Sequence, residues 1–405
     1  MTFVARCDQG LEANWKPVQS TTSLDRFRSA VMTDHALQAR LLELQSDTAF
    51  AAAAEYEARA LGLELEARHI VQTIDTRTTE SPAGPAGLLK LSRAPPKPWI
   101  PFALSLQGDA LALEWIAIAP DGLQHPFFSQ SLAAALQSPF GRFMQCETPI
   151  DALDEFAEAS SPSGLVLHMS RCGSTLVSQM LASVQEFTSI SEAPVLDAML
   201  QLAIHGMAQD RDVRNLVAAL ARNRTGATTH RFVKLDCWHI HALPHLRRIF
   251  PGVPWVFLYR DALEVLVSHR RNPGMHVIPG YMSLECFGIR NTGRIADEDY
   301  PAWILAQYCE AALSAIDDPY GLFVDYRNLP DAVSNSILPH FGCSPNTRQR
   351  AQMDAASRRN AKLPNALFVP DSALKKHEAL HYPETPSQAR LISAIEAIAG
   401  TSATG

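Results

Sequence analysis

The sequence lacks three features that would each define a class of protein. No apolar run is long enough to span a membrane, and residues 1–10 contain no apolar signal segment, so we expect a cytoplasmic protein without a membrane partner. Basic residues form no run and the net charge is −7, which argues against a nucleic-acid partner. The seven cysteines include no Cys-x-x-Cys pair, which indicates free thiols in a reducing compartment.

The composition is that of a folded protein of several domains. Hydrophobic residues make up 47% of the 405 residues and charged residues 19%, so the chain can bury a large core. Periodicity and proline content predict five parts: a flexible tail (1–20), a helical accessory domain (21–80), a Pro/Gly-rich linker (81–98), a small α+β subdomain (99–160) and an α/β domain (161–399).

Residues 23–74 follow a helical period, and Gly62 is placed to end one of the helices. This stretch resembles the helical domain of Nif-eleven-like leader peptides, although no double-glycine cleavage site follows it. The resemblance implies a fused domain that docks a peptide or protein. The alternative is a plain helical hairpin that packs on the rest of the chain.

The segment 99–160 gives a coarser prediction. Alternating apolar residues indicate a β-hairpin that turns at residues 107–109, and short helices are expected at 127–136 and 148–156. No role follows from this pattern.

The stretch 164–176, GLVLHMSRCGSTL, is the most informative part of the chain. An apolar strand (165–169) leads through a small polar turn into a helix, and backbone N–H groups converge at such a helix start, where they can hold a phosphate. The α/β domain as a whole alternates strands with helices, which predicts a parallel sheet. Its expected strands are 165–169, 187–190, 231–235, 255–259 and 321–325.

The turn matches the nucleotide triphosphate loop G-x-x-x-x-G-K-[ST] only in part. Gly173 and Thr175 take the places of the second glycine and the hydroxyl, but His168 replaces the first glycine and Ser174 the lysine. A cation is present earlier, as Arg171. The missing lysine argues against a kinase or ATPase, and an ordinary capped strand–helix turn is the alternative.

A second polar group follows the strand 255–259. Arg260 stands at the strand's end, and Ser268 lies eight residues later in the next helix. A guanidinium offers two parallel donors to a phosphate. Alone, Arg260 and Asp261 would also fit a structural ion pair.

Together the two motifs resemble those of bacterial-type sulfotransferases that use 3′-phosphoadenosine-5′-phosphosulfate (PAPS). The resemblance implies a three-layer, P-loop-type α/β fold and transfer of a sulfuryl group from PAPS to an acceptor, without a metal. It assigns PAPS binding to Arg171, Cys172, Gly173, Ser174, Thr175, Leu176, Arg260 and Ser268. The acceptor is expected to be a hydroxylated small molecule, a sugar or a peptide.

Sulfuryl transfer also needs a base for the acceptor's proton. We expect Glu192 in this role, with a pKa raised by burial, and His168 and His239 are alternative bases. Lys234 is expected to touch the sulfuryl group or to form an ion pair. Arg171 would stabilise charge on the leaving phosphate.

Further residues are weaker candidates. Arg358, Arg359 and Lys362 are candidate contacts of the 3′-phosphate, whereas no role is predicted for Arg327. The thiol of Cys172, beside a cation and a helix start, could have a lowered pKa, or it could simply fit the turn. A P-loop kinase and a non-catalytic binding protein are the alternative functions.

Overall fold

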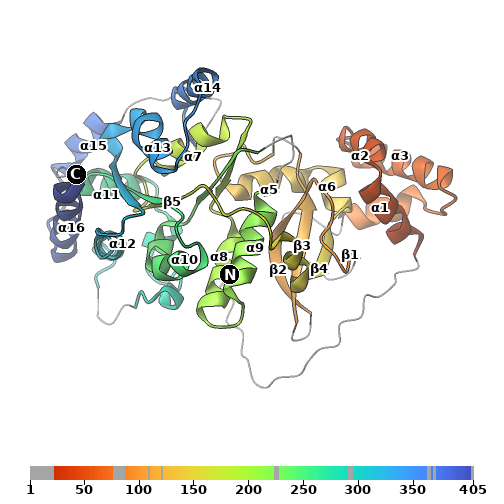
Figure 1. Ribbon diagram of the computed structural model, residues 1–405, viewed down its shortest axis with the longest axis horizontal. Coiled ribbons are helices and arrows are strands. Elements are labelled where there is room, and N and C mark those ends of the chain that lie inside the picture. The colour runs from red at the N-terminus through yellow and green to blue at the C-terminus, as the bar shows by residue number, and fades with distance from the viewer. Residues whose placement is uncertain are drawn as a thin grey trace.

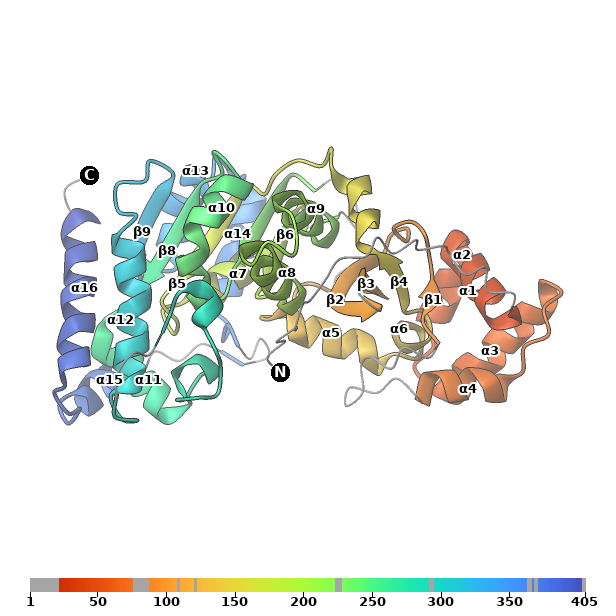
Figure 2. The same ribbon diagram turned by 90° about the horizontal axis from the view of Figure 1, so that it is seen from below.

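The computed structural model describes residues 22–75, 87–107, 110–119, 122–222, 228–290, 295–362, 366–367 and 371–402. The predicted tail at 1–20 lies outside these residues, as does much of the predicted linker. Three parts follow one another along the longest axis of the molecule: four N-terminal helices at one end, a small sheet, and a large α/β part (Figure 2).

The N-terminal helices begin and end where the sequence supplies caps. They are α1 (Ser23–Thr33), α2 (His35–Leu42), α3 (Asp47–Ala60) and α4 (Ala67–Asp75). The Thr22 hydroxyl accepts the N–H of Asp25 at the start of α1. Gly62, in left-handed backbone at φ +70°, follows α3 as predicted, and the N–H of Leu63 donates to Ala58 in a Schellman ending.

These helices pack on the small subdomain through aromatic rings. The Phe50 ring lies 5.4 Å from that of Phe143 and 6.5 Å from that of Phe140, and Phe27 also contacts Phe143. All four side chains are fully buried. The Phe140 and Phe143 rings come from α6 (Pro139–Phe143), so the two parts share one apolar core.

The small sheet contains β1 (Leu89–Lys90), β2 (Trp99–Gln107), β3 (Ala110–Ala117) and β4 (Cys146–Pro149), in the order β1-β4-β3-β2. The predicted hairpin is β2–β3, and the helix expected at 127–136 is α5 (Phe128–Gln137). Two predictions were wrong. β1 falls within the expected linker, and the helix expected at 148–156 starts as strand β4, because Thr148 pairs with Leu113; only Ile150–Phe156 coils, as a 3₁₀ helix.

The five predicted strands of the α/β domain are all present, within one residue of the expected bounds. They are β5 (Gly164–His168), β6 (Phe187–Ser191), β7 (His230–Lys234), β8 (Trp255–Tyr259) and β9 (Gly321–Asp325). All pair in parallel, in the order β6-β7-β5-β8-β9. The central strand β5 is buried along its whole length and lies between β7 and β8. Its carboxyl end is therefore flanked by two neighbouring strands, at the edge where open α/β sheets bind ligands.

Helices cover both faces of this sheet. The chain includes α7 (Ser174–Ala182), α8 (Pro194–Ile204), α9 (Asp210–Leu220), α10 (Leu243–Ile249), α11 (Ala262–Arg271), α12 (Tyr300–Leu313), α14 (Thr347–Ser357), α15 (Ser372–Ala379) and α16 (Pro386–Ser402). Right-handed crossovers put α7, with α14 against it, on the face opposite α8, α10 and α12 (Figure 1). No helix among the described residues is long and apolar enough to cross a membrane.

Candidate active site

The loop after β5, residues 170–175, curls tightly around the start of α7. We call it the phosphate loop, after the role that the sequence predicts for it. Ser170, Arg171 and Gly173 all have left-handed backbone, with φ of 83°, 51° and 88°. A Cβ on Gly173 would lie 2.7 Å from a Leu329 methyl and 2.9 Å from the Tyr326 ring, so only glycine fits. The first N–H groups of α7 have no helical acceptor, so those without a side-chain partner can donate to an anion.

Cys172, Ser174 and Thr175 of the phosphate loop are all buried, with 0%, 4% and 8% of their surface exposed. Within the described residues, the hydroxyls of Ser174 and Thr175 have no hydrogen-bond partner in the protein, so they can donate to a ligand. Cys172 is fully buried, and burial raises the pKa of its thiol to about 11. The lowered pKa considered for Cys172 was therefore wrong, because burial outweighs the nearby cation and helix start.

The second motif lies at the end of the adjacent strand, β8. Arg260 is 5% exposed, and its guanidinium donates from Nε and Nη2 to Glu264, not to Asp261. Asp261 instead caps α11, accepting the N–H of Glu264 at 3.0 Å. The Arg260 guanidinium also lies 3.9 Å from the Tyr326 ring centre. Because Tyr326 also contacts Gly173, its ring joins the two motifs. Ser268 is half-buried in α11.

Glu192 lies at the end of β6 and forms an ion pair with the Lys234 ammonium. Its backbone is left-handed at φ 53°, and its N–H donates to the Lys234 carbonyl at 2.9 Å. The His168 Nε2 is 3.3 Å from the same carboxylate oxygen. Lys234 is 1% exposed, whereas the Glu192 side chain keeps 20% of its surface open.

The pKa expected for Glu192 was wrong in direction. Burial alone would raise it, but the ammonium of Lys234 and the His168 ring together hold the pKa of this carboxyl well below its usual range. Glu192 is therefore ionised. Burial also lowers the pKa of His168, whose Nδ1 accepts the N–H of Ser170 at 3.1 Å, so His168 is neutral at neutral pH.

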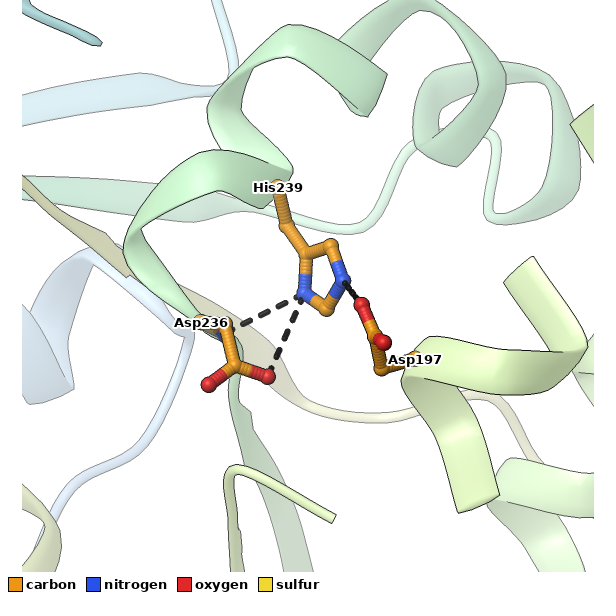
Figure 3. A group of neighbouring side chains, drawn as sticks. All are labelled: Asp197, Asp236 and His239. Atoms are coloured by element: carbon orange, nitrogen blue, oxygen red, sulfur yellow. Dashed lines mark hydrogen bonds and ion pairs between the residues drawn. The ribbon is translucent and has the colours of Figure 1, made fainter. Parts of the chain in front are cut away.

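His239 lies between two carboxylates (Figure 3). Its Nε2 is 2.7 Å from Asp197, and its Nδ1 accepts the N–H of Asp236 at 3.2 Å and lies 3.9 Å from the Asp236 carboxylate. Both ring nitrogens are thus occupied by protein groups and the ring is 1% exposed, so His239 does not fit its alternative role as the acceptor's base.

The same three side chains form a group of possible metal ligands. Their ligand atoms lie within 4.8 Å of one another. The carboxylate oxygen of Asp197 that faces His239 also accepts the indole N–H of Trp238 at 2.9 Å, so a metal ion would have to break existing hydrogen bonds. Burial and the charge of Glu192 raise the pKa of Asp236 to about 8.

Of the three basic candidates near the carboxyl end, Lys362 is the one whose pKa responds to the charges of Arg171 and Lys234, although its side chain is exposed. Partial desolvation and the charges of Arg171 and Lys234 lower the pKa of Lys362 to about 8, as expected for an ammonium close to other cations. Arg359 instead lines a hollow beside the second half of α7, and Arg358 is exposed. Arg327 pairs with its neighbour Asp325 and is 79% exposed, in keeping with the absence of a predicted role.

The small subdomain supplies a wall of the site that sequence analysis missed. The Phe127 ring centre lies 5.1 Å from the Lys234 ammonium. The carbonyl of Pro126 accepts the Ser191 hydroxyl at 2.9 Å, and that of Gln124 accepts the Gln179 amide at 3.0 Å, which tie this segment to β6 and α7. An aromatic residue at a helix start carries no sequence signal for such a contact.

The chain is only weakly similar to known proteins. No protein-family model and no curated protein sequence matches the chain. Among solved structures, the sulfotransferase domain from the curacin biosynthetic pathway is 14% identical, covers 58% of this chain and 98% of its own, and has a TM-score of 0.37. A sulfotransferase from Mycobacterium tuberculosis H37Rv is 13% identical, with 67% and 86% coverage and a TM-score of 0.36. One from Mycobacterium avium is also 13% identical, with 96% and 97% coverage and a TM-score of 0.35. At these TM-scores the similarities do not decide the function.

Proposed function

We propose that the protein is a sulfotransferase that moves the sulfuryl group of PAPS to an acceptor hydroxyl or amine by in-line displacement. One observation carries the proposal: the two sequence motifs lie at the ends of adjacent strands with the ring of Tyr326 close to both, and the Lys234–Glu192 pair lies beside the first of them. A nucleotide with phosphates on both its 3′ and 5′ positions needs two such sites, one ribose apart.

The donor groups suit this nucleotide. Arg171, the hydroxyls of Ser174 and Thr175, and the N–H groups of residues 172–176 are proposed to bind the 5′-phosphosulfate. Arg260 and Ser268 are proposed to bind the 3′-phosphate. Glu264 occupies only Nε and Nη2 of Arg260, and Nη1 has no hydrogen bond to a described residue. Lys362 would add a cation at the rim.

In this reaction, protein groups would stabilise the charge on the leaving oxygen, bind the sulfuryl group and accept the acceptor's proton. The acceptor oxygen forms a bond to sulfur while the bond from sulfur to the bridging oxygen breaks, and that electron pair stays on the 5′-phosphate of 3′-phosphoadenosine-5′-phosphate (PAP). Arg171 and the loop N–H groups stabilise this negative charge. The Lys234 ammonium binds a sulfuryl oxygen, and the acceptor's proton moves to the Glu192 carboxylate.

The switch of Lys234 from Glu192 to the sulfuryl group explains how a carboxylate with a lowered pKa can act as a base. While the ammonium is paired with Glu192, it keeps this carboxyl ionised and weakly basic. Once the sulfuryl oxygens take donors from Lys234, less positive charge remains at Glu192, and its basicity rises.

The alternatives differ in what they require. A kinase needs a lysine and Mg²⁺ at the phosphates, whereas the loop carries Arg171 and a serine at the lysine position. A non-catalytic binding protein needs no base, so replacement of Glu192 would leave its properties unchanged.

A sugar, a peptide or a small hydroxylated metabolite fits as acceptor. A cytoplasmic location stays a prediction from the cysteine pattern.

The direct test is group transfer from radiolabelled PAPS. The purified protein is incubated with a panel of phenols, alcohols, amino sugars and peptides, and labelled products are separated by chromatography. We expect a sulfated product without added metal, and far less of it with the Glu192→Gln variant. Transfer of phosphate from ATP that depends on Mg²⁺, with no use of PAPS, would contradict the proposal and favour a kinase.

A further inference from the structure

The last turn of α11 and the residues just after it hold the phosphate loop at two adjacent residues. His269 Nε2 lies 3.2 Å from the Ser170 hydroxyl oxygen, and the Arg171 guanidinium donates to the Asn272 carbonyl at 2.6 Å. Ser170 is 6% exposed and His269 is 2% exposed, so water does not compete for their contact. His269 directly follows Ser268, which lies in the predicted 3′-phosphate motif.

The hydrogen bond between these two residues has a defined direction. The N–H of Gly274 donates to His269 Nδ1 at 3.3 Å, which leaves the ring proton on Nε2. Burial, with the charges of His276 and Arg171, lowers the pKa of His269 to about 2, so the ring is neutral. Its Nε2–H therefore donates to Ser170, and the hydroxyl proton of Ser170 must point to a different acceptor.

Both held residues have backbone that side chains rarely adopt. The φ angles of Ser170 and Arg171 are 83° and 51°, and such conformations persist only where the surroundings fix them. The two contacts from the end of α11 fall on these same two residues. A loop without them would be free to relax and to move its donors away from the 5′-phosphate.

We infer that His269 is a positioning residue, which holds Ser170 so that the phosphate loop presents its donors at a fixed distance from Arg260 and Ser268. This inference rests on the proposed function. A single helix, α11, then carries one phosphate contact and orients the loop that makes the other. Binding of the bisphosphate nucleotide would depend on His269 although the ring touches neither phosphate.

The test compares two nucleotides, of which only one carries the 5′-phosphate that the phosphate loop would bind. PAP carries both phosphates, whereas adenosine 3′-monophosphate uses only the 3′ site. In calorimetric titrations, His269→Leu should weaken PAP by about tenfold or more, the effect of losing one buried hydrogen bond, and should change the affinity for adenosine 3′-monophosphate little. His269→Gln, whose amide N–H can reach Ser170, should restore most of the PAP affinity.

Two further variants keep the result interpretable. His205→Leu, at an exposed histidine after α8, is the matched control and should bind both ligands like the wild type. Ser170→Ala removes the partner without touching the buried ring, and should also weaken PAP selectively. Equal losses for both ligands, or no loss in Ser170→Ala and His269→Leu, would overturn the inference. Failure of the wild type to bind PAP would instead overturn the proposed function itself.

Discussion

The charge of Glu192 depends most strongly on the Lys234 ammonium, with a further contribution from the His168 ring. Lys234 is 1% exposed, so its own charge is stabilised by the carboxylate and by the ring of Phe127. A buried charge that loses its partner is costly, so under the proposed function Lys234 would bind the sulfuryl oxygens when it leaves Glu192. The proposed mechanism would thereby link ligand binding and activation of the base through one side chain.

Replacement of the base tests this link. Glu192→Gln should lower kcat by roughly 10²- to 10⁴-fold, because the acceptor's proton loses its carboxylate, and should leave PAP affinity nearly unchanged. Steady-state kinetics and PAP titration measure the two effects. Glu186→Gln, at the exposed ion pair with Arg348, is the matched control and should keep full activity. If Glu192→Gln retained its kcat, His168 would become the stronger candidate for the base.

The lowered pKa of Lys362 predicts a pH dependence of PAP binding. In the free protein this pKa is about 8, and a bound phosphate would raise it towards the ordinary value for lysine. Binding should therefore take up a proton near pH 8, and affinity should fall as the pH rises above 8. Titrations in buffers of different ionisation enthalpy measure the uptake. Lys362→Arg should remove the pH dependence, and an unchanged profile in this variant would place Lys362 outside the site.

At the scale of elements, the phosphate loop depends on a glycine whose Cβ position is blocked on two sides. Gly173→Ala would need a left-handed φ and would collide with Leu329 and Tyr326. We expect it to abolish measurable PAP binding. Gly62→Ala is the matched control, because φ there is also left-handed but no atom lies within 4 Å. It should cost about 1 kcal/mol in the free energy of unfolding and leave PAP binding intact. Strong PAP binding by Gly173→Ala would show that the loop does not hold the phosphate.

The sequence was sufficient to predict elements that depend on local pattern. Each of the five parallel strands is a short apolar run next to turn residues, and so all five were found within one residue. The strand at Thr148 was missed because it depends on pairing with Leu113, which is distant in the chain. The wall formed by Phe127 was missed for the same reason.

The chemistry of the site was less predictable than its position. Glu192 was found as a carboxyl that follows a strand, but its low pKa depends on Lys234, which lies on a neighbouring strand. Burial alone predicts the opposite direction. The role of His269 likewise depends on a contact with Ser170, which lies 99 residues earlier.

At the scale of the whole molecule, the N-terminal helices lie at the far end from α16 and share a core with the small subdomain (Figure 2). Deleting them would expose Phe140 and Phe143, so deletion would test stability as much as docking. Substitutions on the surface of α3 and just after it are a cleaner test of docking. Tyr56 is 71% exposed and Leu61 is 50% exposed there.

If residues 21–80 dock a peptide acceptor, Tyr56→Ser combined with Leu61→Ser should raise the KM for that peptide severalfold and leave kcat unchanged. The melting temperature and the PAP affinity should not change, because neither side chain is buried. Kinetics with peptide and small-molecule acceptors distinguish a loss of peptide docking from a general loss of activity. An unaltered KM for every peptide acceptor would contradict docking at this surface and favour a purely structural role for the helices.

The proposed function requires that the ends of β5 and β8 form a site for a nucleotide phosphorylated at both 3′ and 5′. Calorimetric titration with PAP, in the absence of Mg²⁺ and with ATP as the comparison, measures binding at such a site. We expect PAP to bind and ATP not to bind, with PAP binding lost in Arg260→Ala and kept in Arg327→Ala, whose guanidinium is exposed. Absence of PAP binding, together with binding of ATP once Mg²⁺ is added, would contradict the claim.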